Sequence, residues 1–130
     1  KSLQEKYGIT VLYITHDIAT AKYFSDRIAV MYSGRIIEIG PPEKIISEPI
    51  HPYTIKLIAA VPEPDPSNRF KERGVVDGEP PNPSDLHWGC RFESRCNLKK
   101  EENCKSKQPT LVEVKPKHYV ACFLKEKDKS

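Results

Sequence analysis

The stretch VLYITHDIATAKYFSDRIAVMYSGRIIEIGPPEKII, residues 11–46, decides the fold class that we predict for this chain. It begins inside a run of β-favouring residues, 9–15, that lacks polar alternation, and this pattern is typical of a strand buried on both faces. Asp17 follows the run at a position suited to a helix N-cap, because its carboxylate can accept from unsatisfied backbone N–H groups. The spacing then predicts a helix over residues 18–25.

The second half of this stretch predicts a hairpin and short helices. Apolar runs at 27–32 and 35–40 flank Ser33-Gly34, a pair that favours a tight turn between two strands. Paired prolines then end the second strand and start a helix over 42–46, and a further helix is expected over 52–60. The sequence therefore indicates an α/β fold in which a strand, a helix, a hairpin and short helices follow one another.

Composition excludes several classes of protein. The chain has 130 residues, of which 30% are charged, and a net charge of only +3. Basic and acidic residues are interleaved, so we expect no nucleic-acid partner, which would require a concentrated basic face. No run approaches the roughly 20 apolar residues of a membrane span. Residues 1–10 carry no apolar signal-peptide core, so the cysteines are expected to be reduced.

The cysteines lie in a single segment, residues 88–124, at Cys90, Cys96, Cys104 and Cys122. This segment has few large apolar residues, and segments this small usually need a disulfide or a metal as a staple. The spacing lacks the paired C-x2-4-C knuckles of structural zinc sites and the C-x2-C of ferredoxins. Four thiolates suit either a tetrahedral zinc site or a [4Fe–4S] cluster, and disulfides or free thiols remain as alternatives.

Neighbouring side chains have plainer interpretations. We expect His118 to be a surface residue or an outer neighbour of the site, because four cysteines already fill the coordination. Arg91 and Arg95 are expected either to offset thiolate charge or to be exposed. The bulky residues of the segment are expected to pack over the site: Trp88, Phe92, Tyr119, Val120 and Phe123.

Changes in residue composition along the sequence divide the chain into four predicted parts. Residues 1–61 form the α/β part, and residues 62–86, with their many prolines, form an extended connector. Residues 87–124 form a small, irregular, loop-rich extension that binds a metal or cluster. Residues 125–130 carry charge without apolar content and are expected to be disordered.

Two groups of motifs resemble a known family. Residues 11–46 resemble the end of the nucleotide-binding domain of ABC transporters, in which a buried strand delivers a switch histidine in a T-H-D context. The later motifs resemble the C-terminal extension of the oligopeptide/dipeptide importer subset; they are HPYTIKLIAAVP at 51–62, PPNP at 80–83, GCRFESRC at 89–96 and YVACFL at 119–124. Together these motifs span nearly the whole chain.

This resemblance implies roles for specific residues. His16 would hydrogen-bond the γ-phosphate of ATP and help to position the attacking water in the full-length, magnesium-dependent subunit. The four cysteines would ligate a [4Fe–4S] cluster, with zinc as the alternative. The chain contains no phosphate-binding loop, signature motif or Asp-Glu strand end, all of which would precede Lys1. The chain alone is therefore expected neither to bind ATP tightly nor to hydrolyse it.

The resemblance also implies partners and a location. The full subunit would pair with a second ATP-binding subunit, dock on two membrane permeases at the cytoplasmic side of the cell membrane, and receive peptide indirectly from a peptide-binding protein. The truncated sheet edge also invites self-association of this chain. The alternative function is a free-standing zinc or iron–sulfur interaction module. A zinc-ribbon nucleic-acid binder is disfavoured by the small net charge.

Overall fold

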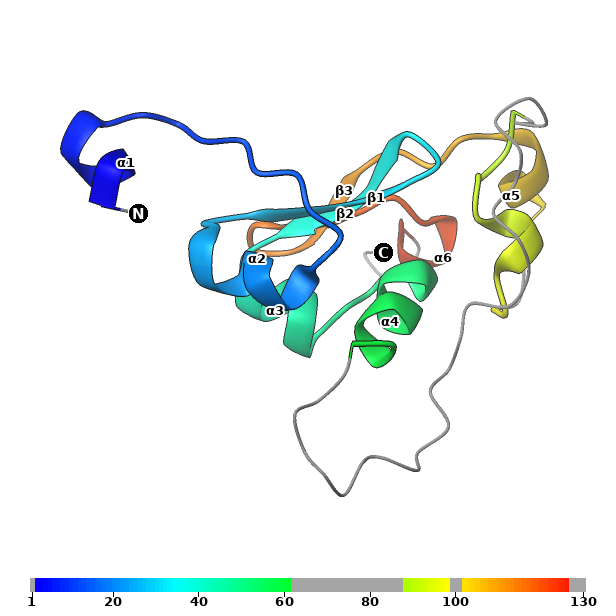
Figure 1. Ribbon diagram of the computed structural model, residues 1–130. Helices are drawn as coiled ribbons and strands as arrows, with labels where there is room; N and C mark the ends of the chain where they lie inside the picture. Colours follow the sequence, from blue (N-terminus) through cyan, green and yellow to red (C-terminus); the bar gives the residue numbers. More distant parts are fainter. Residues whose placement is uncertain (1, 62–87, 99–101, 127–130) are drawn as a thin grey trace, which may run out of the picture.

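The computed structural model describes residues 2–61, 88–98 and 102–126, with the side chains of 125–126 left out (Figure 1). Its centre is a four-stranded antiparallel sheet with the strand order β1-β2-β4-β3. The strands are β1 (Ile28–Tyr32), β2 (Arg35–Gly40), β3 (Val112–Lys115) and β4 (His118–Val120). With helices packed on this sheet, the described part of the chain has the expected α/β class.

The helices are short. They are α1 (Ser2–Tyr7), α2 (Ile18–Phe24), α3 (Pro42–Ser47), α4 (Pro52–Ala59), the 3-10 turn η3 (Glu93–Arg95), α5 (Asn103–Ser106) and α6 (Phe123–Glu126). Helices α2, α3 and α4 lie on the same side of the sheet (Figure 1). Within the described ranges, no helix has the length and apolar content needed to cross a bilayer.

Local sequence signals account for the start of α2 and for the hairpin. The Asp17 carboxylate accepts from the backbone N–H groups of Ala19 and Thr20 at 3.0 and 3.2 Å, as the N-cap prediction requires. Ser33 and Gly34 both have positive φ angles, 45° and 76°, which suits the two-residue turn between β1 and β2. Both features were predicted from neighbouring residues and are confirmed.

A β-bulge sits in the middle of β2. Val30 pairs with Glu38 and Met31 pairs with Ile36, so Ile37 is an extra residue on β2. The normal alternation of the strand is broken there, and Ile37 and Glu38 are both buried. The bulge therefore points the Glu38 carboxyl group into the interior, although the residues beside it on β2 are apolar.

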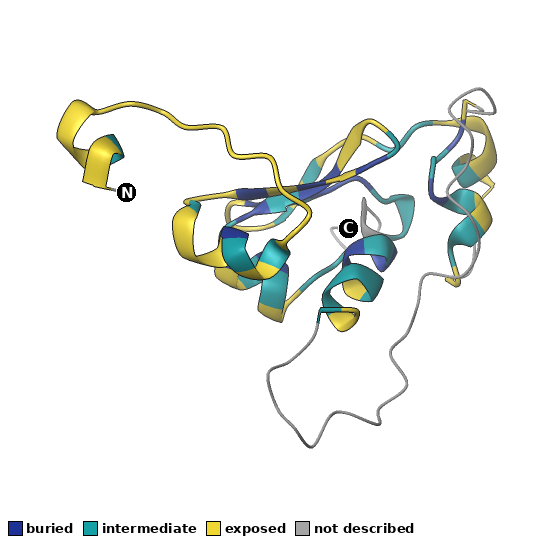
Figure 2. Ribbon diagram, viewed as in Figure 1, coloured by how far each residue is buried: buried dark blue, intermediate teal, exposed yellow. Residues whose placement is uncertain are grey.

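The core lies between the sheet and the helices (Figure 2). Its buried members are Ala21, Ile28, Val30, Tyr32, Ile37, Ile45 and Phe92. Phe92 comes from the cysteine segment, and its ring lies 5.2 Å from that of Tyr32 and 5.6 Å from that of Tyr53, centroid to centroid. The cysteine segment thus shares a core with the hairpin and α4.

The sheet also joins the two regions. Strand β4 pairs with β2 through Glu38↔Val120 and Ile39↔Tyr119, and the Ala121 N–H donates to the Ile37 carbonyl at 2.9 Å. The extension was expected to be irregular, whereas it contributes half of the strands of this sheet. Strands of three and four residues are too short for their alternation to be recognised in sequence. The predicted connector, 62–86, lies outside the described residues.

The strand predicted over 9–15 is wrong. These residues lie in an exposed stretch between α1 and α2 (Figure 2), and the side chains of Leu12 and Ile14 are 87% and 86% exposed. A strand buried on both faces needs a hydrogen-bonded neighbour on each side, and no described strand pairs with this stretch. At the other end, the predicted disordered tail begins too early, because α6 continues through Glu126; residues 127–130 lie outside the description.

Candidate functional site

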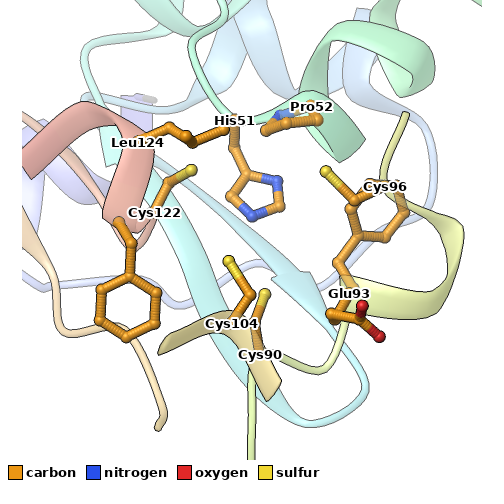
Figure 3. A pocket seen from close by; sticks show the side chains of 10 residues that line it. His51, Pro52, Cys90, Glu93, Cys96, Cys104, Cys122 and Leu124 are labelled. Atoms are coloured by element: carbon orange, nitrogen blue, oxygen red, sulfur yellow. The ribbon is translucent and has the colours of Figure 1, made fainter. Parts of the chain in front are cut away.

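The four cysteines line one cavity, although they come from separate elements (Figure 3). Cys90 precedes the turn η3 and Cys96 follows it, Cys104 lies in α5, and Cys122 lies between β4 and α6. The remaining lining residues are His51, Pro52, Phe92, Glu93, Phe123 and Leu124. The space that these residues surround is about 370 Å³, counting the part that opens to solvent. The structure therefore brings the predicted cysteines to one place.

Backbone contacts hold the cysteine loops together. The Cys90 N–H donates to the Cys104 carbonyl at 2.7 Å, and the Cys96 N–H donates to the Glu93 carbonyl at 3.2 Å. Gly89 makes the first contact possible, because a Cβ at this position would lie only 2.5 Å from the Lys105 carbonyl oxygen. Sequence reasoning missed this glycine, although its place directly before the first cysteine was the available signal.

The cavity favours the neutral thiol form of Cys90 when nothing positive is bound. The pKa of Cys90 is raised to about 11, mainly by burial and to a smaller extent by the like charge of the neighbouring Cys104, Cys122 and Cys96. None of the four cysteines forms a disulfide. A bound cation is what would stabilise thiolates here, since thiolates and not thiols are the ligands of metals.

The donor set suits some metal groups better than others. Among the described residues, no three His, Cys, Asp or Glu side chains form a set that could hold one metal ion. A tetrahedral zinc site requires four donors within about 2.3 Å of a single centre. A [4Fe–4S] cluster requires one thiolate at each of four separate iron corners. Four thiols around a shared cavity fit the second requirement in number and type.

The other residues of the cysteine segment differ in part from expectation. Arg91 Nη1 donates to the Ser33 carbonyl, and Arg95 Nη1 donates to the Tyr32 hydroxyl at 3.2 Å. Both arginines thereby connect the segment to the β1–β2 hairpin. Phe92 and Phe123 do line the cavity, whereas Trp88 is 88% exposed and does not pack over it.

His118 is not a surface residue, which corrects the first of its two expected roles. It is fully buried, and its Nε2 lies 2.7 Å from Oε1 of Glu38, which is equally buried. Its place is set by β4, which runs between β2 and β3 in the sheet. Gly40 leaves room for the ring, since a Cβ there would come within 3.1 Å of it. His118 does not line the cysteine cavity.

Glu38 connects this buried pair to the start of α4. Its Oε1 accepts from the Ile50 N–H and its Oε2 accepts from the His51 N–H, both at 2.9 Å. Sequence reasoning missed Glu38, and the available signal was a lone charged residue inside the apolar run of β2. The carboxyl group thus ties β2, β4 and the α4 entry together.

His51 is the second residue that sequence reasoning missed. It caps α4, with Nδ1 accepting from the Tyr53 N–H at 3.1 Å, and its side chain lines the cysteine cavity. Burial lowers the pKa of His51 to about 4, so the ring is neutral near pH 7. A histidine directly before a proline at the first helical position was the available signal.

His16 lies elsewhere. It is exposed, directly before the Asp17 cap of α2, and it is not among the residues that line the cysteine cavity. The predicted nucleotide-related residue and the predicted cofactor residues therefore belong to two separate places on the chain.

Sequence comparison assigns this arrangement to a class of transport proteins. A family profile described as "Oligopeptide/dipeptide transporter, C-terminal region" matches residues 37–104, from β2 to the third cysteine. The chain belongs to this family. The matched range includes Glu38, His51 and Gly89 as well as three of the four cysteines.

Several curated relatives are similar over most of the chain. A putative peptide import ATP-binding protein of Brucella ovis is 42% identical over 95% of the chain and 38% of its own length. The oligopeptide transport ATP-binding protein OppF of Haemophilus influenzae is 41% identical over 95% of the chain and 37% of its length. A putative oligopeptide transport ATP-binding protein, YkfD, of Bacillus subtilis is 42% identical over 95% of the chain and 38% of its length. The chain spans little more than a third of these relatives.

Proposed function

We propose that the chain serves as the C-terminal portion of the ATP-binding subunit of a peptide importer. The observation that carries this proposal is the family match over residues 37–104, together with relatives that are named peptide import and oligopeptide transport ATP-binding proteins. Such a subunit would couple ATP hydrolysis to peptide uptake at the cytoplasmic side of the membrane. Its partners would be a second ATP-binding subunit, two permeases and, indirectly, a peptide-binding protein.

His16 is assigned the nucleotide-related role within the whole subunit. Replacing His16 by alanine there should lower ATP turnover by orders of magnitude while leaving nucleotide affinity nearly intact, because the side chain acts on the attacking water more than on binding. Asp17→Asn is the matched control, since asparagine also caps helices and the cap is the role of Asp17 in the structure. Unchanged turnover in His16→Ala would refute this role.

The chain by itself should be inactive. It has no phosphate-binding loop, so we expect neither tight ATP binding nor hydrolysis. Calorimetric titration of the chain with Mg-ATP tests this expectation, and affinity in the micromolar range would contradict it.

We further propose that Cys90, Cys96, Cys104 and Cys122 hold a [4Fe–4S] cluster. The supporting observation is that the four thiols line one cavity and that none of them is in a disulfide. When bound, such a cluster supplies a one-electron redox couple. The chain's own contribution is to hold the four sulfurs on loops tied by the Cys90–Cys104 backbone bond and to cover them with Phe92 and Phe123.

Metal analysis of anaerobically purified protein tests the cluster. We expect about four iron and four acid-labile sulfide per chain, lost together in Cys104→Ser. Ser106→Ala, on the same short helix, is the matched control and should retain both. Zinc without sulfide would establish the alternative metal, and protein without iron, sulfide or zinc would refute both.

A further inference from the structure

Among the described residues that line the cysteine cavity, only His51 has a nitrogen-bearing side chain, its imidazole. It is 1% exposed, and Figure 3 shows it between the cysteine side chains, with a ring nitrogen facing the space that the sulfurs surround. Apart from His51, the cysteines and Glu93, the described lining is apolar. His51 is therefore placed to act on whatever the thiols hold.

Both ends of His51 are fixed. Its backbone N–H donates to the buried Glu38 carboxyl group at 2.9 Å, and its Nδ1 accepts from the Tyr53 N–H at 3.1 Å. The first contact anchors the main chain at the entry to α4, and the second fixes the rotation of the ring. The remaining ring nitrogen, Nε2, thus has a defined direction before any ligand binds.

The helix cap also decides which nitrogen carries the proton. Because Nδ1 accepts a hydrogen bond, a neutral ring must carry its hydrogen on Nε2. A metal-ligating histidine has the opposite arrangement when it binds through Nε2: this nitrogen presents a lone pair, and the other ring N–H donates to an outer partner. His51 therefore offers the cavity a hydrogen-bond donor and no ligand atom.

We propose that His51 is a positioning residue that donates its Nε2–H to a sulfur atom of the group held by the four cysteines and thereby raises the reduction potential of that group. The inference rests on the cluster proposed above. A hydrogen bond to a cluster sulfur favours the reduced form, which carries one more negative charge, and hydrogen bonds to sulfur are among the factors that set cluster potentials.

Asparagine at this position separates the two roles of His51. His51→Asn retains a side-chain oxygen that can cap α4, but it lacks the ring that reaches the cavity. In the anaerobically purified whole subunit, a redox titration followed by electron paramagnetic resonance should show unchanged iron and sulfide content. The reduction equilibrium should shift about tenfold toward the oxidised form, which is about 59 mV for one electron. Tyr53→Phe, a neighbour outside the cavity lining, should leave the potential unchanged.

The outcomes distinguish this inference from the proposed cluster. A wild-type protein without iron and sulfide would refute the cluster, and the inference with it. A cluster that is present with the same potential in His51→Asn would refute the inference alone. Loss of iron from His51→Asn would also refute it, because His51 would then be needed to hold the cluster.

A second measurement does not depend on the cluster or on a variant. The nitrogen NMR shifts of histidine-labelled, metal-free chain report which ring nitrogen is protonated. We expect a His51 signal with the proton on Nε2, and a proton on Nδ1 would overturn the proposal, because the tautomer follows from the Tyr53 contact.

Discussion

Replacing Glu38 by alanine would test whether a single buried carboxyl group joins the two regions of the chain. Glu38 is fully buried and accepts three hydrogen bonds, from the Ile50 N–H, the His51 N–H and His118 Nε2, at 2.9, 2.9 and 2.7 Å. These donors belong to the entry of α4 and to β4. Removing the acceptor would therefore leave buried donors without a partner both at the entry of α4 and on β4.

The expected loss of unfolding free energy follows from the number of donors left without a partner. A buried donor without a partner costs about 1–3 kcal/mol, and removing one member of a buried ionisable pair typically costs about 3–5 kcal/mol. Relaxation around the small alanine side chain would recover part of these summed costs. We expect a loss of about 4 kcal/mol in the free energy of unfolding, which is a large part of the roughly 5–15 kcal/mol of an ordinary domain.

Urea unfolding followed by near-ultraviolet circular dichroism measures this loss. With a denaturant slope of about 2 kcal/mol per molar urea, the midpoint should fall by about 2 M. Glu48→Ala is the matched control: Glu48 forms an exposed ion pair with Lys115 of β3, and such pairs contribute little. Its midpoint should not move measurably. If Glu38→Ala behaved like Glu48→Ala, the reasoning on the buried carboxyl group would be refuted.

Three further perturbations test the site. Gly89→Ala should separate the Cys90 and Cys104 loops and abolish iron and sulfide binding, since its Cβ would meet the Lys105 carbonyl; a full metal content would contradict this. Phe92→Ala should lower the free energy of unfolding by about 3–5 kcal/mol through a core cavity, measured by urea unfolding; a loss under about 1 kcal/mol would contradict the shared core. Metal-free chain should lose roughly 3 kcal/mol of stability as the pH falls from 6.5 to about 4, because burial lowers the pKa of His51 and the unfolded ring binds a proton first. His51→Asn should remove that pH dependence. An unchanged profile would show that His51 is not the group that causes it.

Sequence patterns predicted those parts of the fold that neighbouring residues determine. The Asp17 cap needs only the three residues that follow it, and the Ser33-Gly34 turn needs only two positive φ angles. The stretch 9–15 was predicted wrongly because burial on both faces depends on neighbouring strands, which no local pattern contains.

The candidate site was predictable only in part, for the same reason. The cysteines were identifiable from their confinement to one segment, whereas nothing near Glu38 or His51 in the sequence indicates that the cysteine segment returns to meet them. The β2–β4 pairing makes that connection, and the β-bulge at Ile37 turns Glu38 inward. Both are properties of tertiary structure.

The pairing of β2 with β4 has a consequence for the order of folding. Glu38 and His118 are 80 positions apart, and contacts this distant form late because the loss of chain entropy precedes the gain from the contact. The β1–β2 hairpin is local and can form early. A newly synthesised chain should therefore pass through a stage in which the hairpin is folded while the cysteine thiols remain open to oxidants and to a donor of metal.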